Sequence, residues 1–533
     1  MSKQQKPSRS LTGIAGIVAA ATLLSKLVAL VRQQAIAAAF GVGVAANAYN
    51  YAYVIPGFLL VLLGGVNGPI HSAIVSVLAK RDKEDAAPLV ETITTLVSGA
   101  LLLLTIVLFI FADFFINLVG PGLSPTAHAI ATQQLRVMSP MALLAGLIGI
   151  GFGTLNTANQ YWLLSISPVF SSITIIAGLG ILALQLGNQI TAPQYVLVGG
   201  LVLAWGTLAG AILQWLVQLI AQWRLGLGTL RLRFDFHSSG VQEVIKVMGP
   251  ATFSSGMMQI NVYTDLFFAS VIPGAAAAFN YANLLVQTPL GIISNVILLP
   301  LLPMLSRLTD PADWGNLKLR IRQGLILTAL TMLPLGALIV ALAVPIVRVI
   351  YERYAFDQAA SQLVASVLMA YGIGMFVYLG RDVLVRVFYA LGDGDTPFRV
   401  SVVNIFLNAL LDYIFVRPFG APGIVLATVG VNITSTLMFV WLLDRKLNGL
   451  PLREWSLPIL GLTGGSFVAG VASWGTLRIL QQVWGSEGLP IQLLQLSLSA
   501  LVGLSIYALI AAQMKLPEVD IFVSRLRQRF GKG

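Results

Sequence analysis

Two cations lie within one apolar stretch near the N-terminus. Lys26 and Arg32 belong to the segment SKLVALVRQQAIAAAFG (25–41), whose other residues mostly suit a helix in lipid. A charge at mid-bilayer costs at least ~2.5–3.5 kcal/mol, so each side chain should face protein or water. The two lie about 120° apart around one helix, and the span contains no acidic residue. We expect them to face a hydrated cavity and meet an anionic substrate. A buried ion pair with another helix is the alternative.

A second polar set lies in the C-terminal half of the chain. Asn404, Asn408 and Asp412 recur every four residues, which places them on one stripe of a helix. Asp265 lies within another apolar stretch, and Thr428 lies within the stretch that follows the stripe. Oxygen ligands of this kind suit a small cation such as Na⁺, and a carboxylate can instead titrate for H⁺. Hydrogen bonding between helices is the alternative for the asparagines.

Four further cations lie inside apolar stretches. They are Arg136, Lys246, Arg381 and Arg386. Lys246 and Arg386 lie within about two turns of predicted helix ends, from which a long side chain can reach the interface. Arg136 and Arg381 are each either one half of a structural pair or a residue of a cavity.

The elements that position these residues are predicted to be membrane-spanning helices. Of 533 residues, 57% are hydrophobic and 10% are charged, and the mean hydropathy is +0.85, whereas soluble domains carry about 25% charged residues. The first apolar run continues to about Phe40, which favours a span over a cleaved signal peptide. A helix needs about 20 residues to cross a bilayer. That window predicts an all-α protein with fourteen spans, at 11–40, 45–79, 88–119, 127–155, 161–187, 194–222, 240–270, 275–304, 319–347, 360–391, 397–416, 422–443, 456–480 and 489–513.

The distribution of Lys and Arg predicts the orientation. If the N-terminus is cytoplasmic, the even-numbered loops and the two tails contain 22 of the 32 Lys and Arg residues, and six lie inside spans. The odd-numbered loops contain four, namely Arg348, Arg353, Arg417 and Arg478. Positive charge gathers on the cytoplasmic side of membrane proteins. We therefore predict that both termini are cytoplasmic, and we attribute the net charge of +11 to topology rather than to nucleic acid.

The composition excludes several chemistries. The chain has no Cys, which excludes disulfides, thiol nucleophiles, thiolate zinc sites and iron–sulfur clusters. His71, His128 and His237 are scattered, and the phosphate-loop pattern GxxxxGK[ST] is absent. We expect no catalytic residues, no enzymatic activity and no cofactor, apart from Na⁺ or H⁺ as a coupling ion.

Two pairs of segments indicate an internal repeat. AYNYA (48–52) recurs as AFNYA (278–282), 230 residues later. The turn LNTANQYW (155–162) occupies the place of LGDGDTPF (391–398), at an offset of 236. Each pair lies at equivalent positions of two six-helix sets. Six is even, so the copies should share one orientation and be related by an axis along the membrane normal.

The repeat predicts a division into lobes. We expect an N-lobe of helices 1–6 at residues 1–223 and a C-lobe of helices 7–12 at 224–450. The remaining residues, 451–533, contain helices 13 and 14 and a basic cytoplasmic tail. Two lobes related in this way normally enclose a central cavity.

Five segments carry a family resemblance. They are TLLSKLVALVRQQAIAAAFG (22–41), NAYNYAYVIPGFL (47–59), DLFFASVIPGAAAAFNYANLLVQTPLGI (265–292), VILLPLLPMLSRL (296–308) and FYALGDGDTP (388–397). The last, with the following LNALLDYIFVRPFGAPGIVLATVG, is the most specific. Together they resemble the MurJ/MviN family of lipid II flippases, within the superfamily of multidrug exporters of the MATE type and polysaccharide flippases. The resemblance covers nearly the whole chain.

The resemblance implies a function. Members of the family move undecaprenyl-diphosphate-linked peptidoglycan precursor from the inner to the outer leaflet of the bacterial inner membrane, by alternating access between the lobes. Cationic residues of helix 1 face the diphosphate, which corresponds here to Lys26 and Arg32, and Arg381 is added as a candidate substrate-binding residue. Helices 13 and 14 form a groove for the polyprenyl tail. We expect membrane lipids as further partners, no nucleic acid, and a monomer.

The resemblance also implies a sodium site between helices 7, 11 and 12. Its residues correspond here to Asp265, Asn408, Asp412 and Thr428, with the backbone carbonyl of Ile424.

The chain departs from the family in its cations. Arginines that are usual in helix 2 are missing from PGFLLVLLGGVNG (56–68), and an Asp-Arg pair usual in helix 8 is replaced by Asn283 and Leu284. An acidic residue common near the start of helix 2 is Asn47. A flippase for another polyprenyl-diphosphate saccharide is therefore an alternative. A multidrug exporter would need cavity acids rather than cations, and a non-transporting scaffold for wall assembly would tolerate loss of the embedded charges.

Overall fold

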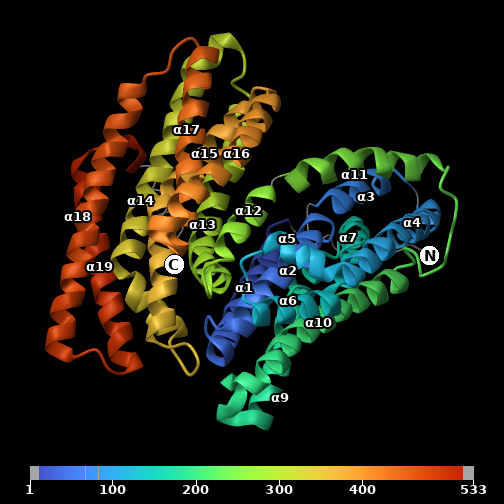
Figure 1. Cartoon of the computed structure of the whole chain (residues 1–533). Helices are drawn as coiled ribbons and strands as arrows, with labels where there is room; N and C mark the ends of the chain where they lie inside the picture. Colours follow the sequence, from blue (N-terminus) through green and yellow to red (C-terminus); the bar gives the residue numbers. More distant parts are fainter. Residues whose placement is uncertain (1–10, 66–67, 82, 258, 520–533) are drawn as a thin grey trace. The chain divides into compact units, whose positions relative to one another are not determined.

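The computed structural model describes residues 11–65, 68–81, 83–257 and 259–519, which contain helices and turns and no strand (Figure 1). Contacts between residues divide the chain into two units. The first consists of Met1–Ala277 with Arg353–Phe356, and the second of Ala278–Glu352 with Asp357–Gly533. The chain is thus the all-helical protein that its composition predicts.

The first unit contains twelve α-helices within its described residues. They are α1 (Leu11–Phe40), α2 (Val44–Leu62), α3 (Pro69–Leu78), α4 (Lys83–Ile110), α5 (Ala112–Val119), α6 (Pro125–Met138), α7 (Met141–Thr157), α8 (Tyr161–Ile166), α9 (Val169–Leu186), α10 (Val196–Arg224), α11 (Ser239–Met257) and α12 (Ile260–Ala269).

The second unit contains longer helices. They are α13 (Ala275–Leu305), whose first residues belong to the first unit, α14 (Trp314–Tyr351), α15 (Gln358–Ala390), α16 (Asp395–Phe419), α17 (Ala421–Lys446), α18 (Leu452–Trp484) and α19 (Leu489–Gln513). Short 3₁₀ turns occur at Gly187–Thr191 and Pro193–Tyr195 in the first unit and at Pro311–Asp313 in the second.

Several predicted spans are broken helices. The span predicted at 45–79 forms α2 and α3, because glycines follow α2 and Gly68 with Pro69 starts a new helix; glycine is a poor helix former, and proline suits a first helical position. The span predicted at 127–155 forms α6 and α7, bent by 42° at the Ser139–Pro140 step. Both breaks lie within apolar sequence, so the hydropathy averaged over a window stays high across them and does not reveal them.

The predicted count of fourteen spans is not confirmed. Twelve helices in the described residues are long and apolar enough to cross a membrane, and the bent pair α6 and α7 makes a thirteenth. The remaining prediction, 240–270, forms α11 and α12 instead of one long apolar helix. α11 carries Glu243 and Lys246, and its mixed polar sequence explains why it does not qualify by composition.

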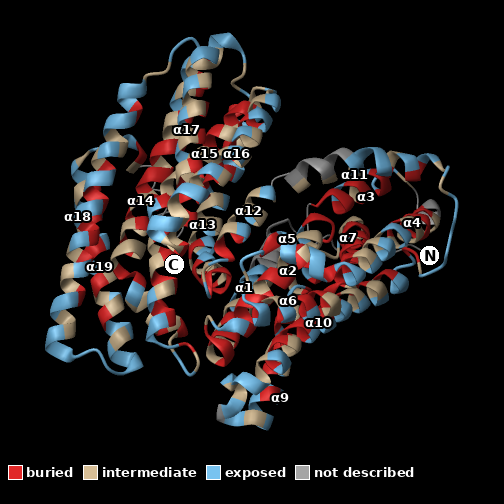
Figure 2. Cartoon of the chain, in the orientation of Figure 1, coloured by how far each residue is buried: buried red, intermediate tan, exposed pale blue. Residues whose placement is uncertain are grey.

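Each unit has its own apolar core (Figure 2). In the first, Ile70 and Ile74 of α3 are buried against Ile93 of α4 and Ala145 of α7. In the second, buried side chains of α14, α18 and α19 meet, and the Tyr507 hydroxyl donates to the Leu330 carbonyl at 3.1 Å. Large apolar side chains on the outward faces are exposed, as expected for helices that lie in lipid.

The units differ from the predicted lobes around α11 and α12. The sequence assigns residues 224–277 to the second lobe, whereas contacts group them with the first unit. The reason is that α11 packs against α3 and α4, and α12 packs against α5. The two lobes and the symmetry axis that relates them remain predictions based on the internal sequence repeat.

The repeated motif occupies equivalent local positions. AYNYA lies in the first turns of α2 and AFNYA in the first turns of α13, and Tyr51 and Tyr281 are both buried. Each helix follows a glycine in the left-handed region, Gly41 at φ +55° and Gly274 at φ +76°. A Cβ at Gly41 would lie 2.5 Å from the Ala355 carbonyl oxygen. Glycine is therefore required there by both conformation and space.

Candidate functional site

The two cations of α1 occur in different surroundings. Lys26 is exposed, whereas Arg32 is half-buried further along the helix. Within the described residues, no salt bridge joins either side chain to a carboxylate. The ion-pair alternative considered for these residues thus finds no support in the described part of the chain.

Arg32 lies beside a pair of stacked tyrosines on α2. The rings of Tyr49 and Tyr53 stack with centroids 5.6 Å apart, and the Tyr49 hydroxyl forms a 2.8 Å hydrogen bond with Thr207 of α10. Both tyrosines are within electrostatic range of Arg32. Arg32 Nε is buried and has no hydrogen-bond partner among the described residues. The result is a fixed positive charge held beside neutral aromatic groups.

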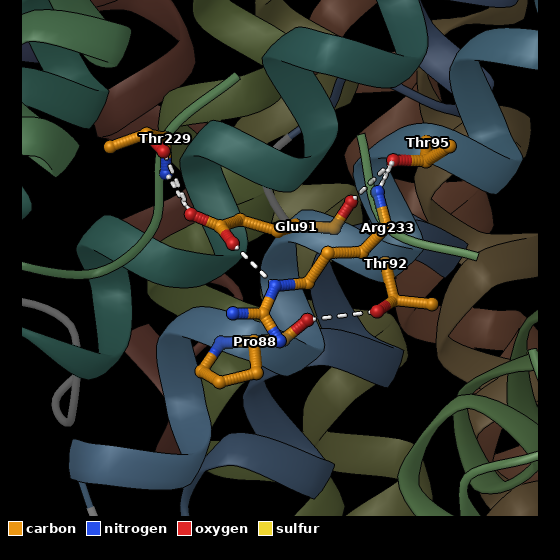
Figure 3. A network of polar contacts seen from close by, with 6 residues as sticks. All are labelled: Pro88, Glu91, Thr92, Thr95, Thr229 and Arg233. Carbon is orange, nitrogen blue, oxygen red and sulfur yellow. Dashed lines mark hydrogen bonds and ion pairs between the residues drawn. The ribbon is translucent and has the colours of Figure 1, made fainter. Parts of the chain in front are cut away.

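A buried carboxylate that the sequence analysis missed lies on α4 (Figure 3). Glu91 is 5% exposed and accepts hydrogen bonds from the backbone N–H of Thr229 at 3.0 Å and from its hydroxyl at 2.7 Å. Arg233 Nε donates to the other oxygen at 2.8 Å, and the Arg233 N–H donates to Thr95 at 3.1 Å. The hydrogen bonds to Glu91 therefore join the segment that follows α10 to α4. Its partners lie 138 and 142 residues away in sequence, so no local pattern indicates them.

The polar stripe of α16 faces α17. Asn408 and Asp412 are 1% and 0% exposed, and Asn408 Nδ2 donates to Asp412 Oδ2 at 2.8 Å. Asn404 accepts from the Ser435 hydroxyl, also at 2.8 Å. A carboxylate buried this deeply is costly unless a cation or a proton neutralises it. The stripe predicted from the four-residue spacing is present and buried.

The other predicted cation ligands divide between the two units. Ile424 and Thr428 lie on α17, where the Thr428 hydroxyl donates to the Ile424 carbonyl at 3.4 Å. The structure thus brings Asn408 together with Asp412, and Thr428 together with Ile424. Asp265 is half-buried on α12 and belongs to the first unit. In the described residues no three His, Asp or Glu side chains gather as a metal cluster.

Arg381 has an acidic neighbour. Its Nη1 lies 3.8 Å from Asp382 Oδ1, and the Arg381 side chain is 22% exposed. Arg381 Nε is buried without a hydrogen-bond partner among the described residues. Of the three predicted substrate-binding residues, Arg381 alone forms an ion pair within the described part of the chain.

The LGDGDTP turn between α15 and α16 forms a polar clip. Lys446 Nζ donates to Asp393 Oδ2 at 2.5 Å, and the Thr396 N–H and hydroxyl donate to the same carboxylate at 3.0 and 2.8 Å. Burial opposes ionisation of Asp393, but these hydrogen bonds outweigh burial and hold its pKa below 3.8. The clip ties this turn to the end of α17.

An open groove lies in the second unit between α14, α15 and α18. Its volume is about 850 Å³, and apolar residues line most of it. Helices 13 and 14 of the sequence analysis correspond to α18 and α19. α18 lines this groove, whereas α19 contributes Gln492 and Gln495 to a small neighbouring pocket.

These features define a multi-pass, all-helical membrane protein with charged and polar side chains inside its spans. The family model described as lipid II flippase MurJ matches residues 36–495. A probable lipid II flippase MurJ of Synechocystis is 59% identical over 530 residues, which are 99% of each chain. A lipid II flippase MurJ of Burkholderia cenocepacia is 29% identical over 468 residues, 85% of this chain and 88% of that one. The chain belongs to the lipid II flippase MurJ family.

Solved structures share the fold. A lipid II flippase MurJ in an inward closed conformation matches with a TM-score of 0.75 at 22% identity, over 93% of this chain and 98% of that chain. An inward-facing multidrug resistance transporter of the MATE family matches with a TM-score of 0.58 at 18% identity, over 81% of this chain and 99% of that chain. These structures share the fold, and the family model and the 59% identical relative confirm the family resemblance inferred from the motifs.

Proposed function

We propose that this protein is a lipid II flippase, which carries undecaprenyl-diphosphate-linked peptidoglycan precursor from the inner to the outer leaflet. The 59% identity to a probable lipid II flippase along the whole chain carries the proposal. Lipid II has an anionic diphosphate between its sugars and its polyprenyl tail. Moving that headgroup through the protein requires positive charge within the spans, which α1 provides.

Arg32 is the residue that we assign to the diphosphate. It is half-buried beside Tyr49 and Tyr53, and within the described residues no carboxylate pairs with it. An arginine binds phosphate oxygens through several N–H donors in a planar arrangement. Lys26 is exposed on the same helix and adds a second, more mobile charge. Arg381 is the third candidate, although its ion pair with Asp382 offsets part of its charge.

The polar residues of α16 and α17 are the candidate coupling site. Asp412 supplies a buried carboxylate, Asn408 an amide oxygen, Thr428 a hydroxyl and Ile424 a carbonyl, which are the hard oxygen ligands that a cation such as Na⁺ prefers. We propose that these residues bind Na⁺, or that the Asp412 carboxylate binds H⁺; Asp265, which the family resemblance adds to the set, belongs to the first unit. Cation binding would then bias the exchange between inward-open and outward-open states.

The proposal implies transport without covalent chemistry. The lobes would alternate access to the headgroup while the polyprenyl tail stays in lipid. The protein would act as a monomer in the bacterial inner membrane with both termini cytoplasmic, as the excess of Lys and Arg in the even-numbered loops predicts.

A related cargo is the second candidate. Asn47, at a position where the family commonly has an acid, accepts a hydrogen bond from the Ala277 N–H at 3.4 Å, so it takes a structural role in the first unit. The missing helix-2 and helix-8 arginines leave fewer cations than the family usually has. Another polyprenyl-diphosphate saccharide would fit such a reduced set.

Complementation tests the proposal. The gene is expressed in bacteria depleted of their own lipid II flippase, as the parent and as Lys26→Ala, Arg32→Ala and Lys246→Ala variants. Lys246 is an exposed cation of the same unit and serves as the matched control. We expect rescue by the parent and the control, and loss of rescue with Arg32→Ala. A parent that reaches the membrane at normal levels and does not rescue would favour the other cargo.

A further inference from the structure

The segment between α10 and α11 presents three large apolar side chains on its surface. Leu230, Leu232 and Phe234 are 54%, 75% and 68% exposed. They alternate with the charged residues at 231, 233 and 235, and residues 231–235 form neither helix nor turn. Side chains of an extended segment alternate between its two faces. One face of this segment is therefore apolar and largely uncovered by the described residues.

The opposite face of the segment is hydrogen-bonded to α4 (Figure 3). Thr229 donates twice to the Glu91 carboxylate. Arg233 donates to the same carboxylate through Nε and to the Thr95 hydroxyl through its backbone N–H. Because Thr229 and Arg233 lie four residues apart, they share one face of an extended segment. These contacts with α4 direct the apolar face away from the helix.

The attachment to α4 determines the depth of the segment in the bilayer. Glu91 and Thr95 follow Ala86, the first residue of the apolar stretch of α4, by five and nine residues, which is about 8 and 14 Å along a helix. The stretch Ala86–Ile110 has 25 residues, so it exceeds a hydrocarbon core of ~30 Å by about 4 Å at each end. The segment thus meets α4 about 4–10 Å inside the edge of the core. Amphipathic helices in the membrane interface lie at a similar depth, ~5–10 Å.

The polar groups of the segment are compatible with this depth. Non-helical backbone needs hydrogen-bond partners in the hydrocarbon region, and the N–H groups of Thr229 and Arg233 have such partners on α4. Arg231 is exposed, and no salt bridge involves it within the described residues. A long arginine side chain can extend from this layer to a lipid phosphate. Trp223, exposed near the end of α10, adds an aromatic residue typical of the membrane interface.

We propose that residues 229–236 form an interfacial anchor in the cytoplasmic leaflet. Leu230, Leu232 and Phe234 insert among the acyl chains of phospholipids. Arg231 binds the phosphates of their headgroups. The occupant is lipid rather than a partner protein, because the segment meets α4 inside a membrane-spanning stretch, where a soluble partner does not reach. The predicted topology gives the leaflet, and the inference is independent of the proposed cargo.

Spin labels on single cysteines test the anchor. The chain has no Cys, so Leu232→Cys and Phe234→Cys each carry one label in the full-length protein, reconstituted into vesicles of phosphatidylethanolamine and phosphatidylglycerol. Electron paramagnetic resonance measures the accessibility of each label to oxygen, which concentrates in lipid, and to a nickel chelate, which stays in water. We expect the oxygen-to-nickel ratio at both positions to be several-fold higher than at His237→Cys, in the polar turn before α11. Leu103→Cys, on the exposed face of α4, is the matched lipid-facing control.

Two further variants test the attachment to α4. Thr95→Val removes the acceptor of the Arg233 N–H and keeps the shape of the side chain. Combined with Leu232→Cys, it should lower the oxygen-to-nickel ratio of the label. Thr105→Val makes the same change further along α4, where the hydroxyl has no hydrogen-bond partner among the described residues, and should leave the ratio unchanged. Equal ratios in the two variants would show that α4 does not hold the segment at its depth.

Two other results would overturn the proposal. Ratios at Leu232→Cys and Phe234→Cys equal to that at His237→Cys would place the segment in water. Labels that neither oxygen nor the nickel chelate reaches would show that a protein surface, of this chain or of a second copy, covers the apolar face. Size-exclusion profiles identical to the parent exclude misfolding of a variant as the cause.

Discussion

Two arginines of the first unit illustrate how this protein uses embedded and near-membrane charge. Arg233 donates to the buried carboxylate of Glu91, which also accepts twice from Thr229. Arg32 lies beside two tyrosines, and its buried Nε has no hydrogen-bond partner among the described residues. Arg233 thus completes a closed network of hydrogen bonds, whereas Arg32 is the residue that we propose to bind the substrate diphosphate.

The difference separates architecture from function. A buried charge whose partner is removed is costly, so a closed network such as that of Glu91 stabilises the fold. Arg32 forms no ion pair among the described residues, and we propose that the diphosphate of the substrate is the partner of this embedded charge. Substitution of Arg233 should therefore lower the stability of the protein and leave transport unchanged. Substitution of Arg32 should slow transport and leave stability unchanged.

The largest expected effect is on transport at Arg32. Arg32→Gln removes a charge-assisted contact to the diphosphate, worth about 1.5–3 kcal/mol, and should slow flipping about tenfold to a hundredfold. Its melting temperature should stay within error of the parent. The rate is measured with fluorescent lipid II in proteoliposomes. The control is Arg233→Gln, which should lower the melting temperature and keep the flipping rate of the folded fraction; the reverse pattern would break the comparison.

The second effect is on stability at Glu91. Glu91→Gln keeps the size of the side chain but removes the charge that binds Arg233 and Thr229, and should cost about 2 kcal/mol of stability, the value of a hydrogen bond to a charged group. Thermal unfolding followed by tryptophan fluorescence measures it. Asp235→Asn, in the same loop, provides the control. An unchanged melting temperature for Glu91→Gln would mean that the network of Figure 3 is not closed in solution.

The third effect extends the comparison to Asp412. If Na⁺ binds there, raising Na⁺ to ten times its Kd should stabilise the parent by about 1.4 kcal/mol relative to choline. Asp412→Asn should lose the response, and Asn404→Ala, on the same stripe, should keep it. Equal melting curves of the parent in Na⁺ and in choline would show that Na⁺ does not bind, which leaves H⁺ as the candidate coupling ion.

The smallest effect concerns the Asp393 clip, a second closed network. Its pKa is below 3.8 in the folded protein, because bonds from Lys446 and Thr396 outweigh the opposing effect of burial. The stabilisation is therefore fully present above pH 3.8 and lost as pH falls through the lower folded value. Asp393→Asn should destabilise the protein equally at pH 8 and pH 5. A destabilisation that is smaller at pH 8 than at pH 5 would show instead that folding raises the pKa of Asp393.

Sequence reasoning recovered the helices better than their breaks. Most predicted span ends agree with the helix ends within a few residues, since charged and turn residues mark them. The breaks at Gly68–Pro69 and Ser139–Pro140 lie inside apolar runs, and a hydropathy window averages over them. The single span predicted at 240–270 is instead formed by α11 and α12, and α11 mixes polar and apolar residues.

The sequence predicted those parts of the candidate sites whose residues lie close together in one segment of the chain. The stripe of Asn408 and Asp412 follows from four-residue spacing, and the two side chains are hydrogen-bonded. The tyrosines beside Arg32 and the partners of Glu91 come from other helices or loops, and no pattern in one segment encodes such contacts. The spacing of Tyr49 and Tyr53 was the one available sign, since residues four apart share a helix face.

The binding of lipid II by Arg32 is the central claim, and its affinity tests it most directly. Native mass spectrometry would give the Kd of purified parent, Arg32→Lys and Arg32→Gln protein for lipid II. We predict that Arg32→Gln weakens binding about tenfold or more and that Arg32→Lys restores part of it, since lysine keeps the charge but not the planar set of donors. Equal Kd values for the parent and Arg32→Gln would contradict the account.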